Sequence, residues 1–166
     1  MPAWLHKLLL TDGMPTTITK LNPGGGLKTL KKIDNYASGI VPVLEQLLEQ
    51  DPNTAYAYTC HPSVVHISKL KGEGGFCGYR NIQMLASYIV SNRSQGYYHF
   101  KDKIPSIFQI QDFIEHAWDV GINTVGRTET GGISGTRKYI GTPEVGRLSA
   151  VAIPYADLNK GTGDAS

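Results

Sequence analysis

A glycine-rich segment, residues 72–75, leads directly into the clearest amphipathic helix of the sequence, and Cys77 lies at the junction. Apolar residues recur at i, i+3, i+4 and i+7, which predicts a helix over residues 77–91 with one buried stripe. The four residues of that stripe are Ile82, Leu85, Ala86 and Ile89. A thiol at a helix start is open on one side, and the amides of the first turn favour a negative charge on the sulfur. The junction therefore suits a thiolate nucleophile, although a free cysteine is more commonly a small buried apolar residue.

Composition excludes several classes of protein. The chain has 166 residues, of which 40% are hydrophobic and 18% are charged, and this balance is typical of one globular domain. A net charge of only +2 predicts neither nucleic acid nor a membrane surface as a partner. Two cysteines do not make a disulfide framework, so we expect a cytoplasmic or nuclear protein. No apolar run approaches the roughly 18–20 residues of a transmembrane helix.

Helix signals dominate the rest of the chain, and strand signals are few. We expect helices within residues 1–12, from Val43 to Gln50 after Pro42, after Ser106, and from Thr142 to about Ala150. Ser106 and Gln109 fit a capping box. Short strands are expected at residues 63–67 and 151–154, a glycine-rich loop at 126–141, and a disordered polar tail at 153–166. Residues 1–166 would thus form a single α+β domain.

Two motifs carry a resemblance to a known family. The first is GFCGYRNIQML at residues 75–85, and the second is GTRKYIGTPE at residues 135–144, in which the aromatic Tyr139 precedes Ile-Gly-Thr and an expected helix start. Together they resemble the nucleophile motif and a second landmark of the ZUFSP-type ubiquitin peptidases. That family is grouped with the cysteine proteases of the ubiquitin-fold modifier. The resemblance covers roughly residues 35–150.

The resemblance implies that this chain is the N-terminal, helix-rich half of a papain-like cysteine protease domain. Cys77 would be the catalytic nucleophile, and it would attack the bond after the C-terminal glycine of ubiquitin or a ubiquitin-like protein through a thioester. The motif-supporting residues would be Gly74, Gly75, Gly78, Tyr79, Arg80, Asn81 and Gln83. We expect no metal and no cofactor.

A general base for the cysteine is missing from the motifs. In papain-like enzymes the histidine lies on the order of a hundred residues or more after the cysteine. On this chain that position would fall beyond Ser166, so we expect an incomplete domain with impaired activity. His116, which has Asp112 and Asp119 on its helix face, and His99 are weak base candidates. A solvated helix face is the simpler interpretation of His116.

Three further interpretations concern residues outside these motifs. Cys60, His61 and His66 match no zinc spacing. The glycine-rich residues 131–138 lack the ending of a phosphate-binding loop. We expect Lys28, Lys31 and Lys32 on a solvated helix face rather than at a nucleic-acid site.

Two alternatives to the protease remain open at this stage. The chain could be a non-catalytic module that binds a ubiquitin-like protein. It could also be a fragment that does not fold stably, because the apolar side of the 77–91 helix would lack the sheet of a complete domain.

Overall fold

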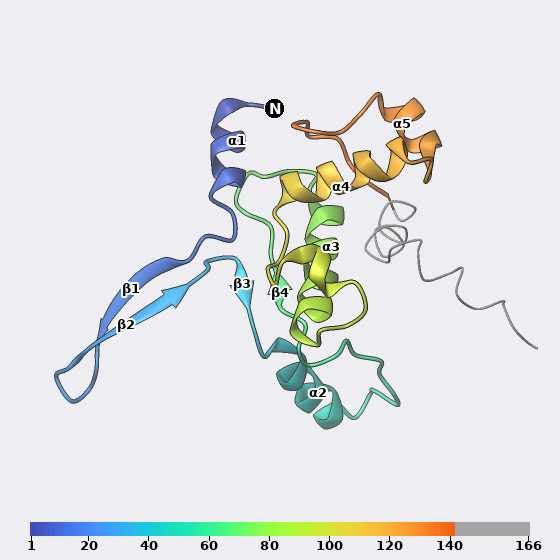
Figure 1. Ribbon diagram of the computed structural model, residues 1–166. Coiled ribbons are helices and arrows are strands. Elements are labelled where there is room, and N and C mark those ends of the chain that lie inside the picture. Colours follow the sequence, from blue (N-terminus) through green and yellow to red (C-terminus); the bar gives the residue numbers. More distant parts are fainter. Residues whose placement is uncertain (142–166) are drawn as a thin grey trace, which may run out of the picture.

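The computed structural model describes residues 1–141 (Figure 1). Within them, five α-helices and two small antiparallel sheets make an α+β fold, which confirms the predicted class. The helices are α1 (Ala3–Leu10), α2 (Ile40–Gln50), α3 (Cys77–Ser91), α4 (Ile107–Asp119) and α5 (Thr124–Thr130), with the 3-10 helix η1 (Tyr97–Phe100) between α3 and α4. Strand β1 (Thr16–Leu21) pairs with β2 (Leu27–Lys32), and β3 (Tyr36–Ala37) pairs with β4 (His66–Ile67).

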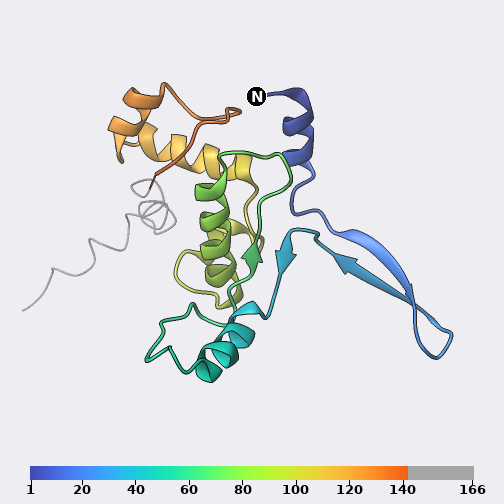
Figure 2. The same cartoon turned by 180° about the vertical axis from the view of Figure 1, so that it is seen from behind.

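The main core lies where α1 and α4 meet the N-terminal half of α3 (Figures 1 and 2). Its buried side chains are Leu5, Leu9, Phe76, Tyr79, Ile82, Ile107, Ile110, Ile114, Trp118, Ile133 and Ile140. Full burial of one such aliphatic side chain contributes about 1.5–3 kcal/mol. The start of α4 is fixed by the predicted capping box. The Ser106 hydroxyl oxygen accepts from the Gln109 amide at 3.2 Å, and the Gln109 side chain accepts from the Ser106 amide at 2.9 Å.

Helix α3 spans the predicted residues 77–91, but its buried face differs from the predicted stripe. Ile82 and Ala86 are buried, whereas Leu85 is 40% exposed. The polar side chains of Arg80, Gln83 and Ser87 are buried instead. Each of them directly follows a buried apolar residue: Tyr79, Ile82 or Ala86. Each also forms hydrogen bonds that offset the cost of burying a polar group. The apolar side of α3 is therefore covered by α1 and α4 over its N-terminal half and by Phe100 of η1 at Ala86, while no sheet within residues 1–141 has more than two strands.

Helix α2 begins at Ile40, three residues before the predicted start. Pro42 lies in its first turn, where a backbone N–H has no partner within the helix, so proline is tolerated there. In this helix only Val41 is buried, while Val43 and Leu47 are 55% and 59% exposed. Helix α2 therefore joins the body through its first turn, and most of its apolar face is open.

The N-terminal region contains a β-hairpin that the sequence analysis missed. Residues 22–26 form its tip, which is closed by hydrogen bonds between Asn22 and both Gly25 and Gly26. Lys28, Lys31 and Lys32 lie on strand β2, so the predicted helix face was wrong. Their neighbours include several threonines, whose β-branched side chains favour an extended backbone.

Two other predicted boundaries also change. Residues 126–130 belong to helix α5 rather than to the glycine-rich loop, and the strand expected at residues 63–67 is reduced to His66–Ile67. The helix expected from Thr142, the strand at 151–154 and the tail at 153–166 lie outside the described residues. Each helix within residues 1–141 is too short or too polar to span a bilayer.

Candidate active site

Cys77 is the first residue of helix α3, and its side chain is exposed. The residues around it are anchored. Phe76 and Tyr79 are fully buried with their ring centroids 5.4 Å apart, and the Phe76 carbonyl accepts from the Arg80 amide at 3.1 Å. Before them, Gly74 has φ +83°, a conformation that favours glycine. A fixed backbone thus presents one accessible thiol at the N-terminus of a 15-residue helix.

The two sequence motifs are in direct contact. The Tyr79 hydroxyl donates to the Lys138 carbonyl at 3.2 Å, and Ile140 packs against Gly78. A Cβ atom at Gly78 would lie 2.9 Å from both Cγ1 and the carbonyl oxygen of Ile140, so only glycine fits without a shift. Segments about sixty residues apart therefore form one surface at the first turn of α3.

A buried ionic network lies beneath this surface. The Arg80 guanidinium, on a residue only 2% exposed, bonds both carboxylate oxygens of Glu73, at 3.0 and 2.5 Å. It also donates to Asp12 at 2.5 Å and to the Gln83 side chain at 2.8 Å. Asp12 in turn accepts from Asn35 at 3.2 Å. Burial lowers the pKa of Arg80, but the bonds and charges of the two carboxylates outweigh it, and the net direction is upward.

This network fixes the glycine-rich loop relative to three other parts of the chain. Glu73 lies within that loop, and its carboxylate also accepts from the Leu70 amide at 2.8 Å. Asp12 follows α1, and Gln83 donates to the Pro105 carbonyl just before α4, at 2.9 Å. The motif-supporting residues Arg80 and Gln83 thus position the loop from below and do not line the exposed thiol.

The loop that carries Ile140 is held by helix α4. One carboxylate oxygen of Glu115 accepts from the Ile133 and Ser134 amides at 2.6 and 2.8 Å. These hydrogen bonds lower the pKa of Glu115, and the bond from the Ser134 amide has the largest effect. The buried Gln111 accepts from the Gly135 amide at 3.0 Å and donates to the Thr136 carbonyl at 3.2 Å.

Two basic side chains approach the glycine-rich loop. Lys69 donates to the Gly74 carbonyl at 3.1 Å, and the Arg137 guanidinium lies where a side chain on Gly74 would be, 2.5 Å from the Cβ position. Gly75, in contrast, has open space beside it, because a Cβ atom there would meet nothing within 4 Å. Asn81 is exposed on α3.

The structure places neither weak base candidate beside Cys77. His99 lies on η1, whose Phe100 packs against Ala86. Ala86 is nine residues along α3 from Cys77, or roughly 13 Å at the helical rise. The His99 ring instead packs against Tyr98, with centroids 4.3 Å apart and the ring planes tilted by 40°.

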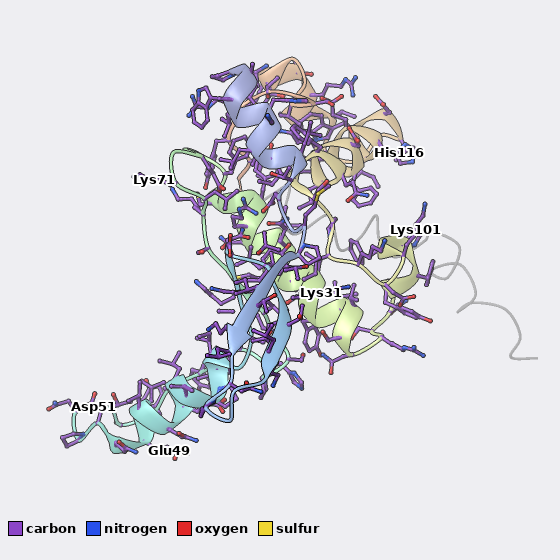
Figure 3. The ribbon with its side chains drawn as sticks, turned by 90° about the vertical axis from the view of Figure 1, so that its left-hand side faces the viewer. Lys31, Glu49, Asp51, Lys71, Lys101 and His116 are labelled. Atoms are coloured by element: carbon purple, nitrogen blue, oxygen red, sulfur yellow. The ribbon has the colours of Figure 1, made fainter. Side chains whose placement is uncertain are left out.

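His116 is exposed on α4, on the side away from the buried residues Ile114 and Trp118, and Figure 3 shows it at the edge of the molecule. The carboxylates expected to orient it have other partners. Asp119 pairs with Arg127 at 2.7 Å, and Asp112 accepts from the Ser134 hydroxyl at 3.3 Å. Within residues 1–141, no group of three or more metal-ligating side chains is present.

Comparisons with known proteins show that this chain is related to a family of peptidases. The model of peptidase family C78 matches residues 53–155, a range that contains Cys77 and the second motif. The chain therefore belongs to peptidase family C78. Over 131 residues it is 31% identical to the human zinc finger-containing ubiquitin peptidase 1 and 30% identical to the mouse protein of that name. These alignments cover 76% of this chain, and the chain spans 23% of the length of each relative.

Proposed function

We propose that Cys77 is the nucleophile of a thiol protease that acts on ubiquitin or ubiquitin-like conjugates. The observation that carries this proposal is the exposed thiol at the start of α3, within the region that matches peptidase family C78. The relatives' name, ubiquitin peptidase, supports the substrate class. In the reaction the thiolate attacks the carbonyl carbon of the modifier's C-terminal glycine, the C–N bond breaks and the protonated amine leaves, and water hydrolyses the resulting thioester.

The first turn of α3 contributes positive partial charge near the sulfur, because the amides at a helix N-terminus lack intrahelical acceptors. A thiol also needs a base, but the His99 ring packs against Tyr98 and His116 is exposed on α4, and neither forms a hydrogen bond with Cys77 in the described residues. We therefore propose that this chain forms a covalent adduct with an activated modifier but turns over native conjugates slowly. A cytoplasmic or nuclear location fits this substrate class.

An activity-based probe tests the nucleophile. Ubiquitin, or the ubiquitin-fold modifier, with a C-terminal propargylamide should form an adduct with the chain, and Cys77→Ala should abolish it. Cys60→Ala is the matched control, because Cys60 is the other exposed free cysteine. Iodoacetamide should label both cysteines. If iodoacetamide reaches Cys77 but neither probe does, the proposal fails.

A second function, a non-catalytic module that binds a ubiquitin-like protein, is favoured because neither His99 nor His116 forms a hydrogen bond with Cys77 within residues 1–141. Titration of labelled ubiquitin into the chain separates the two proposals. Saturable binding that survives Cys77→Ala, without an adduct, supports the binding module. A broad, non-cooperative thermal transition would instead support the unstable fragment.

A further inference from the structure

The β1–β2 hairpin stands apart from the helical body. Figures 1 and 2 show it projecting away from the helices, and its two strands pair only with each other. Eleven of its twelve strand residues are exposed, and the remaining one, Ile18, is half-buried. A two-stranded hairpin without a packed face is marginally stable in water. A partner on this ribbon would supply the contacts that the rest of the described chain does not.

The charge on this hairpin is entirely positive. Residues 13–33 contain four lysines and no acidic residue, so the hairpin carries +4 although the whole chain carries only +2. Within residues 1–141, none of these lysines forms an ion pair. Although neither the net charge nor the lysine pattern of the sequence predicted a nucleic-acid partner, we infer that the β1–β2 hairpin is a docking arm for the phosphate backbone of duplex DNA. This inference is independent of the proposed protease activity.

The strand register gathers three of the lysines on one face. Lys20 lies opposite Lys28, and Lys32 lies opposite Thr16. Alternate residues share a face of a strand, so these positions are on the same side of the ribbon. Like charges directly opposite each other destabilise a strand pair. An anionic partner would remove that repulsion.

Spacing and side-chain chemistry favour a duplex. The Lys20–Lys28 pair and Lys32 are four register steps apart, or roughly 13 Å. The major groove of B-form DNA is about 12 Å wide and admits a two-stranded β-ribbon. Lysines at the two ends of the ribbon could therefore reach phosphates on both sides of the groove. The four threonines of the strands and Asn22 at the tip add further groups that commonly bind phosphate.

Other polyanions fit this surface less well. The strands and tip contain no aromatic side chain, and stacking on aromatic side chains is the usual way to hold single-stranded bases. They contain no arginine either, so sequence-specific contacts to guanine are not expected. The major groove of A-form RNA is too narrow and deep for side chains to read. The hairpin thus suits sequence-independent contact with B-form DNA.

Fluorescence anisotropy with a labelled DNA duplex of arbitrary sequence tests the inference. With three phosphate contacts, the logarithm of the binding constant should fall with the logarithm of salt concentration at a slope of about −2.7. The combined variant Lys20→Gln, Lys28→Gln and Lys32→Gln should weaken binding by about tenfold or more at low salt. The single variants Lys20→Gln and Lys28→Gln should each reduce the magnitude of the slope by about 0.9.

A triple variant of equal charge change is the control. Lys7, Lys101 and Lys103 are exposed, and none of them lies on the hairpin. Figure 3 labels one lysine of each set: Lys101, which follows η1, and Lys31 on β2. Their replacement by glutamine should leave the affinity within about twofold. The inference is overturned by absence of salt-dependent binding, or by equal loss in both triple variants. Equal or tighter binding of polyglutamate would overturn it in favour of an acidic protein partner. Equal binding of single-stranded DNA or duplex RNA would exclude the groove geometry.

Discussion

The charged side chains in the first turn of α3 are buried and paired, whereas those of the β1–β2 hairpin are exposed and form no ion pairs within residues 1–141. At α3, one guanidinium is buried between two carboxylates, and both carboxylate side chains are fully buried. On the hairpin, four lysines lie in water without a carboxylate among their neighbours along the strands. Buried charges need complete pairing, whereas exposed charges are solvated and need none.

The difference indicates what each region can do. The network around Arg80 fixes the backbone before Cys77, because each partner comes from a different segment and each bond constrains that segment. The hairpin has no such restraint, so it can adapt to a partner surface. Positioning of the thiol and docking of a partner would thus lie in separate parts of the chain, and each can be altered without the other.

The largest expected effect comes from breaking the buried network. Arg80→Met should lower the free energy of unfolding by about 3–5 kcal/mol, because it leaves Glu73 and Asp12 charged, buried and unpaired. The measurement is urea unfolding followed by circular dichroism. Arg127→Met is the matched control, since its ion pair with Asp119 joins side chains that are 44% and 60% exposed. The control should cost at most about 1 kcal/mol. If both variants lowered the free energy of unfolding by the same amount, the buried and the exposed ion pairs would not differ in their contribution to stability.

A smaller effect is expected where the two motifs touch. Gly78→Ala forces a Cβ atom against the Ile140 carbonyl, 2.9 Å away, and should cost about 1–3 kcal/mol. It should also slow probe labelling of Cys77, the preceding residue. Gly75→Ala is the matched control, because its Cβ would enter open space and its φ is not positive. The control should be neutral or should stabilise the chain by up to about 1 kcal/mol. If labelling is equally fast in both variants, the contact does not position the thiol.

The parts of the candidate site that depend on neighbouring residues could be predicted from the sequence. Periodicity located α3 with its observed bounds, and the glycines before Cys77 indicated an accessible thiol. The capping box at Ser106 located α4 because its signal needs only four adjacent residues. The contact of Tyr79 with the second motif could not be derived from either segment, since periodicity carries no information about which distant loop covers a helix.

The buried network was missed for a related physical reason. Glu73 and Arg80 are charged, and charged residues are rarely fully buried unless they are paired. A pair seven residues apart across a loop–helix junction has no fixed spacing signature, and Asp12 is 68 residues from Arg80. The hairpin was missed because three of its lysines lie near two leucines at a spacing that also suits a helix. The threonines of β1 and the glycine-rich tip were the signals that favoured strands.

The smallest effect is expected on the hairpin itself. Leu27→Ser replaces a side chain that is 75% exposed at the end of β2, so the free energy of unfolding should change by no more than about 0.5 kcal/mol. Leu9→Ala is the contrasting variant in the core, where the side chain is fully buried and the loss should be about 2–5 kcal/mol. Leu27 lies next to Lys28 and thus on the opposite face of the ribbon from the proposed docking lysines. Duplex binding should therefore be unchanged in Leu27→Ser. A loss of more than about 1 kcal/mol would mean that the hairpin is packed against a partner surface in solution, and the contrast between a fixed site and a free arm would no longer hold.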